Sequence, residues 1–170
     1  MLSQIAAIGG AVFFTGAMIY AALEDARCYT IRNKLVLAVA GGWLLVAPLA
    51  GLSLAQMGLS LGTGALVLAV TFTLFALNAI GGGDAKLAAA AALWLGPEGA
   101  LAFALGTMLI GGVLAMALLA FRAAPLPATL YGQAWVARLQ SPQTGLPYAV
   151  AMAPAALLAL PSAPWLAQLV

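Results

Sequence analysis

Two aspartates, Asp25 and Asp84, are the residues of this 170-residue chain best suited to chemistry. They are half of its four acidic residues, and each stands at the end of a long apolar run. A carboxylate beside hydrocarbon is costly unless it is paired or hydrated. Each aspartate is therefore a candidate functional residue, and if the two met they would form a pair that shares a proton.

Paired carboxylates are the groups that one kind of peptide hydrolysis needs. The ionised acid activates a water molecule, and the protonated acid donates to the carbonyl oxygen. Two carboxylates held close together do not both ionise easily, so their proximity retains the shared proton. Each aspartate also has a simpler explanation: Asp25 is a loop residue beside Arg27, and Asp84 is the N-cap of a helix that follows three glycines.

Three residues near Asp84 have candidate supporting roles. Gly81 and Gly83 are able to adopt positive φ and leave the backbone uncovered, which would let a substrate peptide approach Asp84 closely. Lys86 would balance the local charge or hold one acid ionised. Alternatively, Lys86 marks the membrane boundary as a lysine whose ammonium group reaches the polar interface.

The composition predicts a membrane protein. Hydrophobic residues make up 65% of the chain, charged residues 6%, and the mean hydropathy is +1.12, whereas about a quarter of a soluble domain is charged. With six basic residues and a net charge of +2, the chain has no tract to follow a nucleic-acid backbone. One cysteine, Cys28, and no histidine exclude an internal disulfide and a thiolate or imidazole zinc site. We expect no metal and no other cofactor.

Six apolar segments are candidate spans, because a helix needs roughly 20 apolar residues to cross about 30 Å of hydrocarbon. They are residues 5–23, 35–52, 57–80, 85–96, 99–121 and 147–168. The fourth gives only about 18 Å of helix, so it is a short crossing, a short buried helix or a re-entrant turn. We predict an all-α fold: a polytopic membrane helical bundle of about six transmembrane helices, the fourth short, in a single domain over residues 1–170.

The basic residues predict the topology, because loops that carry Lys and Arg prefer the cytoplasmic side. If all six segments cross, Glu98 falls on one side and every basic residue falls on the other: Arg27, Arg32, Lys34, Lys86, Arg122 and Arg138. If the fourth does not cross, Arg122 and Arg138 change sides. We therefore predict six crossings of the cell membrane, with both aspartates at the cytoplasmic face and both termini outside.

One long stretch, residues 122–147, is predicted not to span. Its four prolines exclude a continuous helix. It is either a short helix lying among the lipid headgroups or a plain connector, in a cytoplasmic or interfacial position.

Three motifs between residues 25 and 151 resemble those of the prepilin peptidases, the intramembrane aspartic proteases that trim the leaders of type IV pilins and related proteins, and they occur in the family's order. The GxGD-x-K-L motif of that family resembles residues 81–87, Gly-Gly-Gly-Asp-Ala-Lys-Leu. Its first-aspartate motif resembles Asp25 followed by residues 30–35, in which Arg32 stands where proline is usual before Asn33. Its last-span signature resembles residues 145–151.

The resemblance implies an aspartic endopeptidase with Asp25 and Asp84 as catalytic residues, supported by a set of motif residues: Gly81, Gly83, Lys86 and Asn33. Its substrates would be type IV, Flp-like prepilins or pseudopilins, in which a short basic leader precedes an apolar helix. Larger members carry an insertion with paired CxxC motifs, associated with zinc and methylation. This chain lacks both features and so resembles the short Tad/Flp branch, for which we expect no methyltransferase activity.

Two other classes of function stay open. A non-catalytic subunit of the pilus or secretion machinery would retain the peptidase fold, and that machinery is also a candidate partner of an active enzyme. A small proton- or cation-coupled transport protein would use the acids as an ion site, although no ladder of polar residues crosses the predicted spans. Small residues within the spans suit helix packing inside one chain or between chains, so the oligomeric state stays open.

Overall fold

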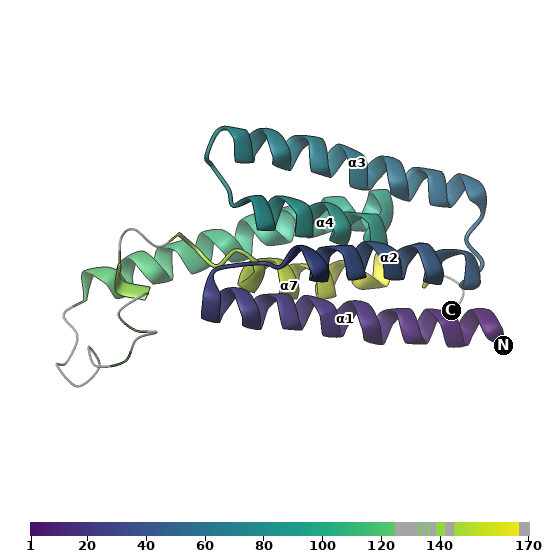
Figure 1. Ribbon diagram of the computed structural model, residues 1–170, viewed down its shortest axis with the longest axis horizontal. Helices are drawn as coiled ribbons and strands as arrows, with labels where there is room; N and C mark the ends of the chain where they lie inside the picture. The colour runs from purple at the N-terminus through teal and green to yellow at the C-terminus, as the bar shows by residue number, and fades with distance from the viewer. Residues whose placement is uncertain (125–132, 134–135, 137–138, 142–144, 167–170) are drawn as a thin grey trace.

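The chain folds into helices that run side by side (Figure 1). The computed structural model describes residues 1–124, 133, 136, 139–141 and 145–166. Its elements, in chain order, are α1 (Leu2–Cys28), α2 (Asn33–Leu49), α3 (Leu54–Ala76), α4 (Gly82–Ala123), α7 (Ala149–Ala159) and the short 3-10 helix η1 (Leu160–Ser162). The described residues contain no β-strand, and the predicted all-α fold is confirmed.

The long helix α4 is broken at Gly96, where φ is 67° and ψ is −175°. The chain doubles back there (Figure 1), which divides α4 into an inner arm, residues 82–95, and an outer arm, residues 97–123. A Cβ atom at position 96 would lie 3.0 Å from Cδ of Pro164. Glycine fits this reversal because it alone combines a positive φ with no side chain.

The two arms correspond to the fourth and fifth predicted segments. The inner arm has about 21 Å of helix at 1.5 Å per residue. It ends beside Ser60, whose Oγ lies 3.6 Å from the Cβ position of Gly96, and Ser60 is two turns inside the start of α3. The fourth segment is therefore a short buried helix that stops before the end of the bundle. The outer arm then returns the chain toward the end where the inner arm begins (Figure 1), so Arg122 does not change sides.

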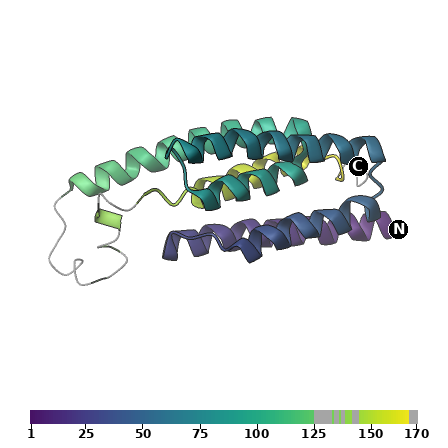
Figure 2. The same cartoon turned by 45° about the horizontal axis from the view of Figure 1, so that its top comes forward.

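Three helices are long and apolar enough to cross a membrane: α1, α3 and α4. Two shorter apolar helices, Asn33–Leu49 and Ala149–Ser162, lie among them. Figure 2 shows α1 and α2 along one side of the bundle and α3 with α4 along the other. These features confirm a membrane helical bundle.

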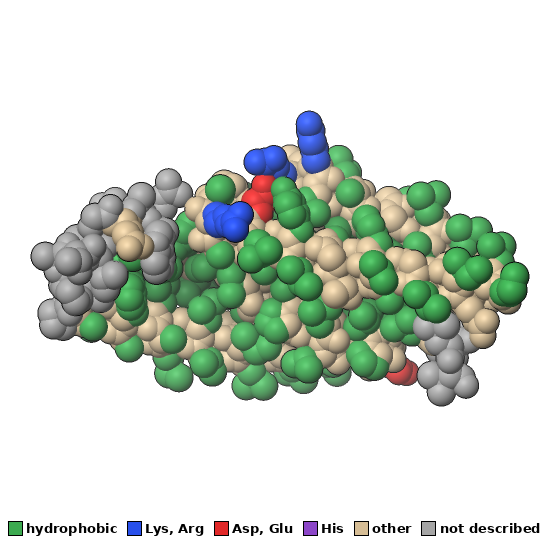
Figure 3. Space-filling model, turned by 90° about the horizontal axis from the view of Figure 1, so that it is seen from below, with side chains coloured by type: hydrophobic (Ala, Val, Ile, Leu, Met, Phe, Trp, Pro, Cys, Tyr) green, Lys and Arg blue, Asp and Glu red, His purple; other side chains and the backbone are tan. Residues whose placement is uncertain are grey.

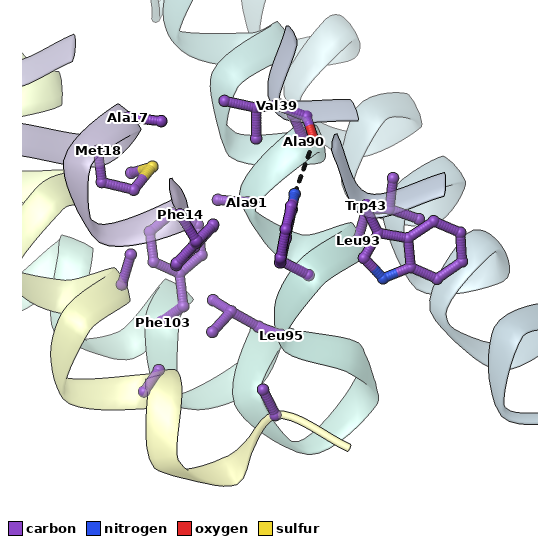
Figure 4. Packing of buried hydrophobic residues seen from close by; sticks show 14 of the residues in the cluster. Phe14, Ala17, Met18, Val39, Trp43, Ala90, Ala91, Leu93, Leu95 and Phe103 are labelled. Carbon is purple, nitrogen blue, oxygen red and sulfur yellow. Dashed lines mark hydrogen bonds between the residues drawn. The ribbon is translucent and has the colours of Figure 1, made fainter. Parts of the chain in front are cut away.

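The inner arm forms the centre of the core. Every residue from Ala89 to Gly96 is buried, and its Trp94 packs against Phe14 and Trp165 with ring centroids 5.3 Å apart in each pair. The Trp94 indole N–H donates to the carbonyl of Val39 over 2.8 Å, the dashed line in Figure 4. Trp165 donates in turn to the carbonyl of Trp94 over 2.7 Å. These buried contacts fix the inner arm against α1, α2 and the segment after η1.

One end of the bundle carries most of the charged residues. Here α1 and α3 end, and α2, the inner arm and α7 begin (Figure 1); we call it the polar end. Its described basic residues are Arg27, Arg32, Lys34, Lys86 and Arg122, whereas Glu98 follows the reversal at the other end. Figure 3 shows basic side chains gathered beside an acidic one, with hydrophobic side chains over most of that face. Arg138 and most of the 122–147 connector lie outside the described residues.

Candidate active site

Asp25 lies in the last turn of α1 and is buried, with 5% of its surface exposed. Its Oδ2 accepts a hydrogen bond from the backbone N–H of Ala149 over 3.0 Å. Ala149 is the first residue of α7, and an N–H in the first turn of a helix has no acceptor within its own helix. The positive N-terminus of α7 therefore holds the Asp25 carboxylate in place. Asp25 is a helix residue at the polar end, and not a loop residue.

Asp84 lies in the first turn of α4 and is half-buried. The N-cap of that helix is Gly81, so Asp84 stands three positions after the cap. Its carboxylate accepts a hydrogen bond from the backbone N–H of Gly81, the return bond of a capping box. A cap-like bond thus positions the carboxylate without burying it completely.

The two aspartates are brought together at the polar end, from α1 and from the inner arm. Their carboxylates are near enough for the two charges to interact. Asp84 also lines a cavity of about 410 Å³ between α3, both arms of α4 and α7. A pair of acids beside a cavity of this size is able to hold a water molecule against a bound substrate.

The motif glycines do not have the backbone conformation predicted from the sequence. Gly81 has a φ of −71°, and the described glycines with positive φ are Gly51 and Gly96. The expectation of a positive φ at Gly81 and Gly83 is therefore wrong. The structure indicates a need for space, since a Cβ atom on Gly81 would lie 2.8 Å from Oδ2 of Asp84.

Gly83 allows the chain after α1 to pack against the start of α4. A Cβ atom at Gly83 would lie 3.1 Å from Cβ of Ile31 and 3.5 Å from its backbone nitrogen. Ile31 belongs to the short connection between α1 and α2. This connection follows Asp25 by a few residues, so the size of residue 83 affects how closely the two aspartate-bearing segments approach.

Lys86 and Asn33, two of the predicted supporting residues, are in contact. The Lys86 ammonium group donates to Oδ1 of Asn33 over 3.1 Å. Both side chains are exposed. The bond joins the first residue of α2 to the fifth residue of α4, two positions after Asp84.

Arg32 pairs with Glu24, the acidic neighbour of Asp25. The Arg32 Nε lies 2.8 Å from Oε1 of Glu24, whose side chain is 8% exposed. Arg32 is the N-cap residue of α2 and has extended backbone, with φ −71° and ψ 136°. That φ is one that proline also adopts, so the backbone of this turn is compatible with the proline that is usual here.

Sequence reasoning missed two polar contacts at this site. The Thr71 hydroxyl donates to the carbonyl of Ala85 over 3.1 Å, which joins α3 to the residue after Asp84. The second is the N–H of Ala149 on Asp25. A backbone group has no signature in the sequence, although Ala149 falls within residues 145–151, the segment that resembles a last-span signature.

Comparison with known proteins gives one match. The sequence profile described as the type IV leader peptidase family matches residues 12–116, more than half of the chain. No curated protein and no solved structure matches. The matched range includes both aspartates, the glycine motif, Lys86 and Asn33. The chain belongs to the type IV leader peptidase family.

Proposed function

We propose that this peptidase is an intramembrane aspartic endopeptidase in which Asp25 and Asp84 are the catalytic pair. The observation that carries the proposal is their meeting at the polar end of the bundle, where the two charges interact and Asp84 borders a cavity. The acids come from helices far apart in the sequence. Separate contacts hold each of them: Ala149 for Asp25 and Gly81 for Asp84.

The reaction follows from the chemistry of two acids that share one proton. The ionised carboxylate takes a proton from water as the water oxygen bonds to the scissile carbonyl carbon, and the other carboxyl donates its proton to the carbonyl oxygen. The tetrahedral intermediate then collapses, the C–N bond breaks, and a proton passes to the leaving amine. Water is the nucleophile throughout, so no covalent bond to the enzyme forms.

The substrate class is a prepilin or pseudopilin with a short basic leader followed by an apolar helix. In such a substrate the helix lies in the bilayer, and the cleaved bond lies at the membrane surface. The position of the aspartates among the basic residues of one end supports this arrangement. Because Lys and Arg prefer the cytoplasmic side, we assign the polar end to the cytoplasmic face of the inner membrane.

Within the family we assign the chain to the short Tad/Flp branch, because its one cysteine cannot form the paired CxxC motifs of the larger members. We therefore propose leader cleavage without methylation of the new N-terminus. Residues 1–170 form one domain in this assignment, with 122–147 as its connector.

The test is to coexpress the chain with an Flp-type prepilin and to read the N-terminus of the pilin by mass spectrometry. Loss of the leader only when the chain is present supports the proposal. An intact leader across a panel of Flp-type prepilins, with the chain well expressed, would favour a non-catalytic assembly subunit. An ion flux in proteoliposomes that contain the chain would favour the transport alternative, since a peptidase gives none.

A further inference from the structure

The cavity beside Asp84 is almost entirely apolar. It is lined from α3, from both arms of α4 and from α7, and its polar wall residues are Asp84, Thr71, Thr107 and Tyr148. Its volume of about 410 Å³ lies in the range of ligand-binding pockets, roughly 300–1,000 Å³. Apolar side chains are therefore the chemistry that it would bind.

The cavity extends from the polar end toward the middle of the bundle. On the inner arm it runs from Asp84 to Ala88, one turn further from the polar end. On the outer arm it runs from Ala115 to Ala100, about 22 Å of helix. A chain whose scissile bond lies at Asp84 would therefore place its membrane-embedded residues along this cavity and its leader outside the polar end.

Thr107 provides a polar group part of the way along this wall. Its Oγ1 is buried and has no hydrogen-bond partner among the described residues, and the residue lines the cavity. A buried hydroxyl without a partner is costly. A backbone carbonyl of a bound chain, freed where its helix is unwound near the cleaved bond, would satisfy the Thr107 hydroxyl.

Gly112 leaves a gap in the outer-arm wall of the cavity, toward the polar end. A Cβ atom built on it meets no heavy atom within 4 Å, although the residue lines the cavity. A larger side chain at this position would therefore enter the open space without displacing the backbone.

We propose that this cavity is the subsite for the first apolar side chains after the cleaved bond, with Gly112 setting the largest side chain accepted and Thr107 binding the substrate backbone. The proposal rests on the function proposed above. It adds a specificity that the family membership does not give: the residue after the bond is selected by the space opposite Gly112. Tyr148, the N-cap residue of α7, and Met152 of α7 also line the cavity.

The first test is Gly112→Leu, assayed on an Flp-type prepilin with Phe or with Ala directly after the cleaved bond. Filling the space should lower kcat/KM for the Phe substrate by roughly 10-fold or more and leave the Ala substrate within about twofold. The matched control is Gly58→Leu, because Gly58 is also an exposed helical glycine with no atom within 4 Å of its Cβ position but does not line the cavity. Equal cleavage of both substrates by Gly112→Leu would overturn the subsite.

Thr107→Val removes the hydroxyl at nearly constant volume. It should raise KM with little change in kcat, and Thr107→Ser should restore KM. If Thr107→Val leaves KM unchanged, the backbone contact is wrong.

A second readout separates the subsite from the catalytic proposal. The double variant Asp25→Asn/Asp84→Asn is combined with a prepilin that carries a photoreactive residue directly after the cleavage position. The expected crosslinks are to cavity residues, and Gly112→Leu should abolish them. Crosslinks elsewhere, with wild-type cleavage intact, would overturn the subsite alone. Cavity crosslinks without any wild-type cleavage would support the subsite and overturn the catalytic proposal.

Discussion

The carboxylate of Asp25 and the backbone N–H of Ala149 are joined by a 3.0 Å hydrogen bond, which connects the first α-helix of the chain to the last α-helix described. The bond places an acid at the positive end of a helix and leaves that acid beside Asp84. Residues at opposite ends of the sequence therefore support one site. The second aspartate, Asp84, comes to this site from α4, which lies between α1 and α7 in the sequence.

We expect Gly81→Ala and Gly83→Ala to lower cleavage strongly while the protein still inserts. A methyl group on Gly81 would lie 2.8 Å from Oδ2 of Asp84, and one on Gly83 would lie 3.1 Å from Ile31. A displacement of a catalytic group by about 1 Å costs up to roughly 100-fold in rate. Steady-state cleavage of a prepilin measures the effect. The control is Gly58→Ala, which meets no atom within 4 Å and should retain activity; full activity of Gly81→Ala would refute the role of space at this position.

Lys86 and Asn33 should affect activity through the one hydrogen bond that they share. Lys86→Met and Asn33→Ala each remove the 3.1 Å contact between α2 and α4, so each should lower kcat/KM by a similar factor, about two- to fivefold for an exposed contact worth up to about 1 kcal/mol. The double variant should be no worse than either single one. A double-mutant cycle measures this, and additive losses would show that the two residues act separately.

Gly96→Ala should destabilise the fold. The residue has φ 67°, and its Cβ would lie 3.0 Å from Pro164, so the change strains the reversal by about 1–3 kcal/mol. Thermal or denaturant unfolding in detergent is the measurement. Gly58→Ala, in a regular helix with open space around it, is the control and should be neutral or stabilising. If Gly96→Ala unfolds with the wild-type midpoint, the reversal does not depend on glycine.

The stability lost in Arg32→Gln should be partly recovered by a second substitution at Glu24. Arg32→Gln leaves the buried Glu24 carboxylate without its 2.8 Å partner, at a cost of about 1 kcal/mol, since Arg32 itself is largely exposed. Adding Glu24→Gln removes the unpaired charge and should recover part of the loss. Unfolding midpoints of the four proteins measure the coupling, and a double variant less stable than Arg32→Gln alone would contradict it.

The sequence predicted the parts of this site that lie in short strings of residues. Asp25 and Asp84 stand at the ends of apolar segments, and Lys86 and Asn33 belong to motifs whose resemblance implied supporting roles. The reversal at Gly96 also agrees with the end of one predicted segment, 85–96, and the start of the next, 99–121. The sequence left the crossing of the fourth segment open, because its dozen residues give only about 18 Å of helix.

Other features required the tertiary structure. The contact of Ala149 with Asp25 is made by a backbone N–H, which every residue except proline possesses. The space requirement at Gly81 depends on where its neighbour Asp84 turns its side chain. In the sequence, Thr107 is a polar residue within an apolar segment. Only the packing of α3, α4 and α7 puts it on a cavity wall.

The central claim is that Asp25 and Asp84 together perform the hydrolysis, and cleavage by Asp25→Asn and Asp84→Asn tests it most directly. Asparagine retains an oxygen that accepts the hydrogen bond of each aspartate, so both variants should fold and insert. Mass spectrometry of the pilin N-terminus should show cleavage lowered by roughly 10²- to 10⁴-fold in each. Glu98→Gln, at the other end of the bundle, should cleave like the wild type. Substantial cleavage by either aspartate variant would contradict the account.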